Sequence, residues 1–155
     1  MPERHPARCS RLTATERPLL NKFYKTQGSA MRASEGGEAW VVRAGEIVAA
    51  LNLTPVPGGQ WLTGLLVAFS WRGTGMASRL IETACAEQCT WLFCHPDLQG
   101  FYERLGFEVT EALPQALADR LARYRRSKSL LAMYRSQSSL AGSSPGTAPR
   151  CSRNG

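Results

Sequence analysis

An apolar strand pattern passes directly into a helical pattern through a turn that contains two glycines. The strand pattern covers residues 60–70, and the helical pattern runs over residues 76–88. The turn between them reads Arg-Gly-Thr-Gly and occupies residues 72–75. The strand is apolar enough to lie in the interior of a sheet. A buried strand followed at once by a helix is typical of chains whose helices connect strands, so this junction favours a mixed α/β fold.

The remaining sequence predicts strands and helices in a definite order. Further strand patterns cover residues 40–43, 46–53, 90–95, 107–109 and 129–134. Further helical patterns cover residues 13–27, 96–105 and 114–124. The first of these begins with Thr13 and Glu16 at the spacing of a capping box. The order α-β-β-β-α-β-α-β-α-β predicts a mixed fold in which one hairpin is followed by crossovers.

Length and composition fit one folded domain with two flanking segments. The chain has 155 residues, and we predict that residues 12–135 form the domain. Residues 1–11 form an N-terminal segment that can supply a short first strand. Residues 136–155 are rich in Ser, Gly, Ala and Pro. We predict a disordered tail there, because so few large apolar side chains bury too little surface to offset the ordering entropy.

Several classes of protein are disfavoured by the same composition. No run of about 18 apolar residues exists, and the N-terminus lacks the apolar segment of a secretory signal. We therefore expect a cytoplasmic protein that has no membrane partner. The five cysteines include no Cys-x-x-Cys pair, and only two histidines accompany them. We therefore expect no metal site.

The formal net charge is +7, and most of the positive charge comes from arginine. The densest group of cations consists of Arg120, Arg123, Arg125, Arg126 and Lys128. This group is either a solvated face, an attractor for an anionic ligand, or a contact for nucleic acid. Positive charge alone is weak evidence for nucleic acid, so we do not expect that partner.

The glycine-containing turn has two interpretations. The N–H groups at a helix start lack partners within the helix, the helix dipole adds positive potential, and glycine allows close approach, so the turn can bind an anion. Alternatively, the glycines serve only the geometry of the turn. The dinucleotide fingerprint is absent, because Ser78 stands where its third glycine would be, and the lysine of a Walker A motif is missing too.

A second motif, Gly-Phe-Tyr-Glu-Arg-Leu-Gly-Phe-Glu, follows about 25 residues later, after one further strand. Leu98, Phe101, Tyr102 and Leu105 have the spacing of one helix face, and Gly106 fits a left-handed C-cap. Tyr102 is either a core tyrosine whose hydroxyl finds a partner or a functional residue.

Together the two motifs resemble the GNAT superfamily of N-acetyltransferases. Arg72, Gly75 and Ala77 occupy the positions of its motif A, Arg/Gln-x-x-Gly-x-Gly/Ala. The sequence Phe-Tyr-Glu-Arg-Leu-Gly-Phe is similar to the motif that follows it in this family. The order of elements also agrees, so the resemblance covers residues 12–135.

The resemblance implies a fold, a cosubstrate and a set of ligands. The implied fold is of the α/β (α+β) class, with a mixed, mostly antiparallel central sheet, two splayed parallel strands and flanking helices. Acetyl-CoA would lie between those two strands, with its pantetheine arm paired to the backbone of Leu66 and Val67. Its pyrophosphate would be held by the backbone N–H groups of Arg72, Gly73, Thr74, Gly75, Met76 and Ala77.

The resemblance also implies direct transfer of the acetyl group to an amine. Tyr102 matches the general-acid tyrosine of the family, and a backbone N–H near Val67 would stabilise the oxyanion. No general base is identified, since Glu38 and Glu82 lack supporting context. The family often has a proline where this chain has Phe69, and an asparagine where it has His95, which is either a cap or a surface residue.

The acceptor is expected to be a primary amine of a small molecule or a protein. In this family, segments corresponding to residues 27–38 and 113–128 determine the acceptor, and the second segment carries the cations. A basic rim disfavours polyamines and aminoglycosides. The alternative functions are a non-catalytic acyl-CoA-binding sensor of the same fold and a nucleic-acid binder. Exposed strand edges would allow a homodimer, although nothing in the sequence specifies one.

Overall fold

The computed structural model describes residues 7–33 and 36–137 of the chain. The predicted tail therefore lies outside the described residues from residue 138 onward, and so do residues 1–6 of the N-terminal segment. A short first strand is present in the described part of that segment. It is β1, Arg8–Arg11, and it pairs with the next strand in antiparallel fashion.

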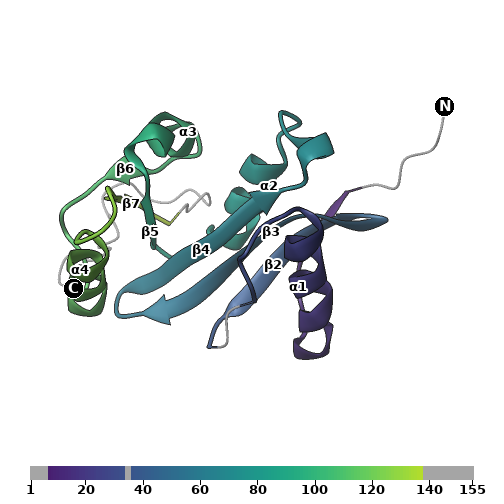
Figure 1. Cartoon of the computed structure of the whole chain (residues 1–155), viewed down its shortest axis with the longest axis horizontal. Helices are drawn as coiled ribbons and strands as arrows, with labels where there is room; N and C mark the ends of the chain where they lie inside the picture. Colours follow the sequence, from purple (N-terminus) through teal and green to yellow (C-terminus); the bar gives the residue numbers. More distant parts are fainter. Residues whose placement is uncertain (1–6, 34–35, 138–155) are drawn as a thin grey trace. The chain divides into compact units, whose positions relative to one another are not determined.

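After β1, the strands and α-helices follow one another in the predicted order (Figure 1). The strands after β1 are β2 Glu38–Ala44, β3 Glu46–Val56, β4 Gly59–Val67, β5 Thr90–Cys94, β6 Glu108–Val109 and β7 Leu131–Arg135. The helices are α1 Arg17–Thr26, α2 Met76–Ala84, α3 Gln99–Glu103 and α4 Gln115–Tyr124. Single 3-10 turns precede α1, α2 and α3, namely η1 Ala14–Glu16, η2 Phe69–Trp71 and η3 Pro96–Leu98.

The strands form a seven-stranded mixed sheet in the order β1-β2-β3-β4-β5-β7-β6. β4 and β5 are parallel, whereas the pairs β1–β2, β2–β3, β5–β7 and β6–β7 are antiparallel. The parallel register joins Gln60 to Thr90 and Trp61 to Trp91. The predicted fold class, a mixed and mostly antiparallel sheet flanked by helices, is confirmed.

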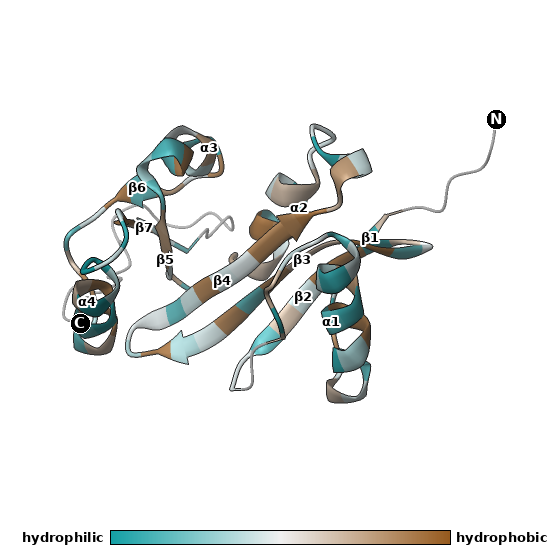
Figure 2. Ribbon diagram, in the orientation of Figure 1, coloured by the Kyte–Doolittle hydropathy of each residue, from teal (hydrophilic) through white to brown (hydrophobic). Residues whose placement is uncertain are grey.

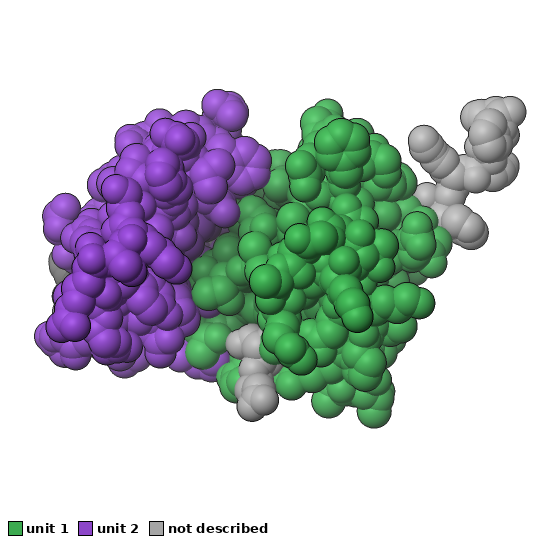
Figure 3. Space-filling view, in the orientation of Figure 1, with its two compact units in different colours: residues 1–54, 62–84 green, residues 55–61, 85–155 purple. Residues whose placement is uncertain are grey.

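The chain divides into two compact units, which we describe separately (Figure 3). Unit 1 comprises residues 1–54 and 62–84, and unit 2 comprises residues 55–61 and 85–155. The first three residues of β4 therefore belong to unit 2, and the rest of that strand belongs to unit 1.

In unit 1, helices cover both faces of the sheet formed by β1 to β4. Leu20, Phe23 and Tyr24 are the buried face of α1, and they pack against Val41 and Ala50 of the sheet. The second helix, α2, lies on the opposite face (Figure 1). The hydrophobic character of β4 continues to its carboxyl end, where it enters η2 (Figure 2). This core fixes the end of β4 and the start of α2.

The predicted capping box is present at the start of η1, the turn that precedes α1. The Thr13 backbone N–H donates to Glu16 Oε1 over 3.0 Å, and Pro18 lies in the first turn, where its missing N–H is harmless. The end of α2 differs from the prediction, because the helix stops at Ala84 instead of continuing to residue 88. The next carbonyl, that of Cys85, accepts a hydrogen bond from Arg135 Nη1 over 3.5 Å.

Other predictions are also wrong, among them the end of the strand predicted over residues 60–70, since β4 stops at Val67. The turn after β3 was expected from residue 54, but β3 continues to Val56, past Pro55. The pairing between β2 and β3 ends at Glu38, which lies opposite Leu53. Pro55 lies beyond this pair, so its missing N–H interrupts no hydrogen bond to β2. Leu98, expected on an apolar helix face, lies in η3 and is 44% exposed.

In unit 2, α4 covers one face of the sheet. Leu117 of α4 packs against Cys89 and Trp91, which are also buried. The strand β7 pairs with both β5 and β6. Gly106 ends the α3 segment with φ +95°, the left-handed C-cap that the sequence predicts.

Candidate functional site

A left-handed glycine interrupts β4 in unit 1. Gly64 has φ +66°, and its carbonyl accepts a hydrogen bond of 2.6 Å from the Tyr24 hydroxyl. That hydroxyl accepts a bond of 3.1 Å from Asn52 Nδ2, and burial raises the pKa of Tyr24. A Cβ on Gly64 would lie 2.7 Å from the Tyr24 hydroxyl. Sequence reasoning missed this arrangement, although a glycine inside an apolar strand is the usual signal of a bulge.

The last residues of β4 present a strand edge. In unit 1 the strand order is β1-β2-β3-β4, so the residues of β4 in this unit have a strand neighbour on one side only. Leu66 is half-buried against the core of this unit. Immediately after the strand, the Ala68 N–H donates to Val48 O over 2.8 Å. The edge is therefore held in place from the β3 side, and its other side has the geometry for an added extended chain.

The turn from β4 to α2 presents consecutive unpaired N–H groups. The first hydrogen bond of α2 runs from Arg79 N to Gly75 O over 3.0 Å. Within the described part of the chain, six earlier N–H groups donate to no recorded acceptor, namely those of Gly73, Thr74, Gly75, Met76, Ala77 and Ser78. These donors lie at the positive end of the helix dipole, which is the arrangement that binds phosphates in many proteins.

The two glycines of this turn leave the space beside the donors open. Gly73 has φ +79° and Gly75 has φ +85°, and no atom lies within 4 Å of a Cβ built on either residue. Both are exposed, whereas Met76 is buried below them as the first residue of α2. The turn therefore has a closed apolar side and an open polar side.

Arg72 stabilises the end of β4. Its Nε donates to the carbonyl of Val67 over 3.1 Å, and its guanidinium lies over the Phe69 ring at 5.5 Å. Its backbone N–H donates to Phe69 O over 3.3 Å, so this N–H is already used within the protein. The Thr74 hydroxyl donates in turn to the carbonyl of Trp71. These bonds hold the turn in one conformation.

Tyr102 lies in α3, in unit 2. Its ring makes edge contacts with Phe101 and Phe107, at centroid distances of 5.0 and 5.8 Å. Burial, and secondarily the neighbouring Cys94 thiol, raises the pKa of Tyr102 to about 12. Its hydroxyl makes no recorded hydrogen bond to any described residue. The phenol is therefore protonated at neutral pH and can donate a proton or a hydrogen bond.

Two other residues singled out in the sequence have structural roles. His95 Nδ1 accepts a bond of 3.0 Å from the Asp97 N–H, so His95 caps η3. Glu38 is exposed and pairs with Arg11 over 3.1 Å. Neither contact indicates a general base.

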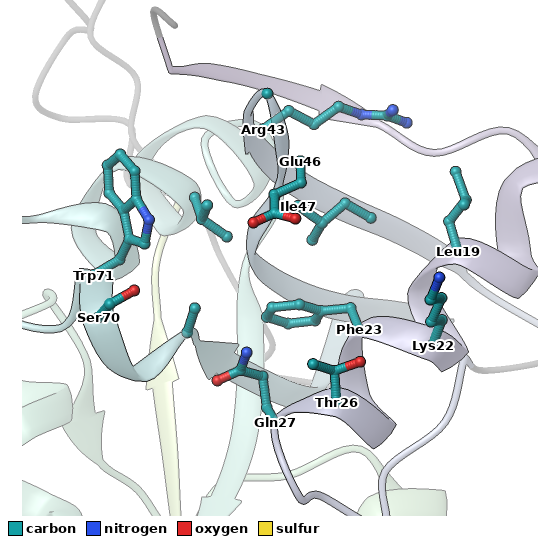
Figure 4. A pocket seen from close by; sticks show the side chains of 13 residues that line it. Leu19, Lys22, Phe23, Thr26, Gln27, Arg43, Glu46, Ile47, Ser70 and Trp71 are labelled. Atoms are coloured by element: carbon teal, nitrogen blue, oxygen red, sulfur yellow. The ribbon is translucent and has the colours of Figure 1, made fainter. Parts of the chain in front are cut away.

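A pocket that the sequence did not predict lies in unit 1, beside η2 (Figure 4). Its volume is about 360 Å³, and it is lined by α1, by the turn and start of β3, and by η2. Phe23 lies within it, and the Glu46 carboxylate points into it from the β3 side (Figure 4). Gln27 Oε1 accepts a bond of 3.1 Å from Phe69 N and so joins α1 to η2. None of the predicted site residues lines this pocket.

The predicted residues thus fall into two groups. Leu66, Val67 and residues 72–77 lie in unit 1, where the end of β4 joins α2, and Tyr102 lies in unit 2. Within the described ranges, no three His, Cys, Asp or Glu residues are close enough to hold a metal ion. Across the same ranges, no helix has the length and apolar character needed to span a membrane.

Comparison with known protein families finds one matching domain. The family model of the GNAT acetyltransferase domain matches residues 35–109. This range contains the end of β4, the turn and Tyr102. No curated protein matches the sequence.

Solved structures with a similar fold include several acetyltransferases. A GNAT-family acetyltransferase from Staphylococcus aureus has a TM-score of 0.63 and 13% identity, over 84% of this chain and 99% of that one. The ribosomal-protein-S18-alanine N-acetyltransferase from Escherichia coli has a TM-score of 0.63 and 16% identity, over 88% and 97% of the two chains. N-acetylglutamate synthase from Neisseria gonorrhoeae, complexed with coenzyme A and N-acetyl-glutamate, has a TM-score of 0.60 and 13% identity, over 86% and 36%.

The family model covers the two motifs on which the resemblance rests, and the solved structures share the fold. Residues 35–109 therefore match a GNAT acetyltransferase domain, and the chain has the fold of GNAT-family acetyltransferases.

Proposed function

We propose that this chain is an N-acetyltransferase that moves an acetyl group from acetyl-CoA directly to a primary amine of a small molecule or a protein. The observation that carries the proposal is the open row of N–H groups over residues 73–78, which donate to no recorded acceptor among the described residues and lie one 3-10 turn beyond the end of β4. In this proposal residues 12–135 form the catalytic domain, together with β1.

The cosubstrate would bind through backbone groups. The N–H groups of residues 73–77 would donate to the pyrophosphate, and the open space beside Gly73 and Gly75 would admit its oxygens. The pantetheine arm would pair with the strand edge at Leu66 and Val67, as an added strand does. A neighbouring N. gonorrhoeae structure contains coenzyme A, which supports the choice of cosubstrate.

The reaction would proceed in one displacement. An uncharged amine attacks the thioester carbonyl carbon, so that a carbon–nitrogen bond forms while the carbon–sulfur bond breaks. A backbone N–H near Val67 stabilises the oxyanion. Tyr102 gives its proton to the departing thiolate, and the proton lost by the amine passes to a base or a water chain and restores the phenol.

A phenol whose pKa is about 12 is a suitable acid only if the thiol it protonates is also basic. Burial has that effect on thiols in the same unit, since it raises the pKa of Cys85 to about 11 and raises the pKa of Cys94. The same desolvation would raise the pKa of the coenzyme thiol and so narrow the difference from Tyr102.

A second candidate function is a non-catalytic acyl-CoA sensor. It is favoured by one observation: Glu38, a carboxylate considered as the base, is exposed and paired with Arg11. Incubation of the protein with acetyl-CoA and a panel of amino acids, diamines, aromatic amines and peptides separates the two functions. If the chain is an N-acetyltransferase, chromatography of the products should detect one molecule of acetylated amine for each molecule of coenzyme A that is released. Micromolar binding of acetyl-CoA without transfer to any of these amines would favour the sensor.

A further inference from the structure

We propose that the carboxyl end of α4 and the turn after it form a docking surface for a short acidic polypeptide segment. We call this the basic surface, and it consists of Arg120, Arg123, Arg125, Arg126 and Lys128. The proposal goes beyond acetyl transfer and does not depend on acetyl-CoA binding, because none of the five residues is a proposed acetyl-CoA ligand.

The cations of the basic surface have no recorded acidic partner in the part of the chain that the structure describes. No salt bridge recorded among the described residues involves any of the five. Asp119, the adjacent acid, accepts a bond of 2.8 Å from Gln115 Nε2 instead. Arg125 Nε donates to the carbonyl of Leu130 over 3.0 Å. Five uncompensated cations within nine residues exceed what the dipole of one helix end accounts for, and like charges three or four residues apart destabilise a helix.

Two of these cations, Arg120 and Lys128, lie over aromatic rings. The Arg120 guanidinium lies over the Trp61 ring at 4.7 Å, and Lys128 lies over the Tyr124 ring at 5.6 Å. Phe93 lies between the two rings, with centroid distances of 5.5 Å to Trp61 and 6.2 Å to Tyr124. This arrangement restricts the long side chains, so less conformational entropy is lost when they bind an anion.

The same cluster contains an unused hydrogen-bond donor. The Nε1 of Trp61 is buried and has no hydrogen-bond partner among the described residues. A buried donor without an acceptor is unfavourable for folding and calls for an explanation. An oxygen of a bound segment next to the Arg120 guanidinium would provide the acceptor, so this donor indicates a ligand that carries oxygen acceptors.

Charge and shape favour an acidic polypeptide over nucleic acid. Arg120 and Lys128 already occupy ring faces on which a nucleobase would stack. The basic surface is also short, and exposed acids of the same unit, Glu108, Glu111 and Asp119, would repel a longer polyanion. Guanidinium groups bind carboxylates through paired N–H donors, so a few Asp or Glu side chains match this surface.

The proposal is tested by fluorescence anisotropy with a labelled eight-residue glutamate-rich peptide, its glutamine counterpart and a labelled single-stranded oligonucleotide. At low salt we expect the full chain to bind the acidic peptide but not the glutamine peptide. The acidic peptide should dissociate as the salt concentration rises. The double variant Arg123→Glu with Arg126→Glu should weaken binding at least about tenfold, because it reverses two exposed charges.

The matched control is Lys25→Glu with Arg32→Glu, which makes the same charge change at exposed cations of unit 1, one of them also in the last turn of a helix. It should leave the affinity within about twofold, a small change for distant charges. Circular dichroism and acetyl-CoA titration should be unchanged in both variants, which separates this test from the proposed function. The proposal would be overturned if the acidic peptide did not bind, or if the control variant weakened binding as much as the test variant. It would also be overturned if the oligonucleotide bound more tightly than the acidic peptide and the test variant lost that binding.

Discussion

Tyr102 combines a raised pKa with a hydroxyl that has no recorded hydrogen bond to a described residue. The Phe101 and Phe107 rings make edge contacts with its ring. Tyr24 shows the opposite situation: its hydroxyl has two hydrogen-bond partners and serves the fold. The contrast supports a chemical role for Tyr102 and a structural role for Tyr24.

The substitution Tyr102→Phe tests this role. We expect kcat for acetyl transfer to fall about 100-fold or more, because the departing thiolate loses its proton donor. The dissociation constant for acetyl-CoA should be unchanged. Tyr134→Phe, a half-buried tyrosine of the same unit, is the matched control and should retain full activity. A Tyr102→Phe protein with the wild-type kcat would refute the assignment.

The pH dependence of kcat/KM gives an independent test. The protonated phenol is the active form, and its pKa is raised to about 12, so its contribution is lost only as the pH rises through that value. We therefore expect no fall in kcat/KM between pH 7 and pH 10. A fall as the pH approaches 10 in the wild type that disappears in Tyr102→Phe would show an unperturbed phenol, whose pKa is about 10.

At the scale of single elements, β4 depends on contacts that its own sequence does not contain. The left-handed Gly64 is held by Tyr24 and Asn52, which lie 40 and 12 residues away. The end of the strand is fixed by Arg72 and by the carbonyl of Val48. The direction in which β4 enters the turn is therefore a tertiary property.

The substitution Gly64→Ala tests that dependence. Alanine would be strained at φ +66° and would meet the Tyr24 hydroxyl at 2.7 Å, so the free energy of unfolding should fall by about 2–4 kcal/mol. Urea denaturation measures it. Gly28→Ala is the control, since Gly28 has φ +77° with nothing within 4 Å, and its loss should be about 1 kcal/mol. Equal falls in the free energy of unfolding for the two variants would mean that the close approach of Tyr24 to Gly64 has no effect on stability.

Local patterns predicted the elements better than their connections. The capping box at Thr13, the C-cap at Gly106 and the buried stripe of α2 follow from spacing within one or two turns, and the structure confirms them. The contacts of the left-handed Gly64 and the pocket beside η2 depend on residues far apart in sequence, and no local pattern predicts them.

At the scale of the whole chain, the order of elements predicted a mixed α/β fold, and the family resemblance predicted its mixed, mostly antiparallel sheet. The parallel pair β4–β5 has two register positions, and β4 belongs to both units. Motif A and the motif that contains Tyr102 could be recognised in the sequence because each is short and contiguous. The basic surface was visible as a group of cations, but its aromatic support by Trp61, Phe93 and Tyr124 depends on tertiary packing.

The central claim is that the turn after β4 binds the pyrophosphate of acetyl-CoA. Its most direct test is calorimetric titration of wild type, Gly75→Glu and Gly28→Glu with acetyl-CoA. Both variants place the same charged side chain at an exposed left-handed glycine with open space beside it, so they are matched in backbone strain. We predict micromolar binding to the wild type and to Gly28→Glu, and loss of binding in Gly75→Glu. Equal binding by all three proteins would contradict the claim.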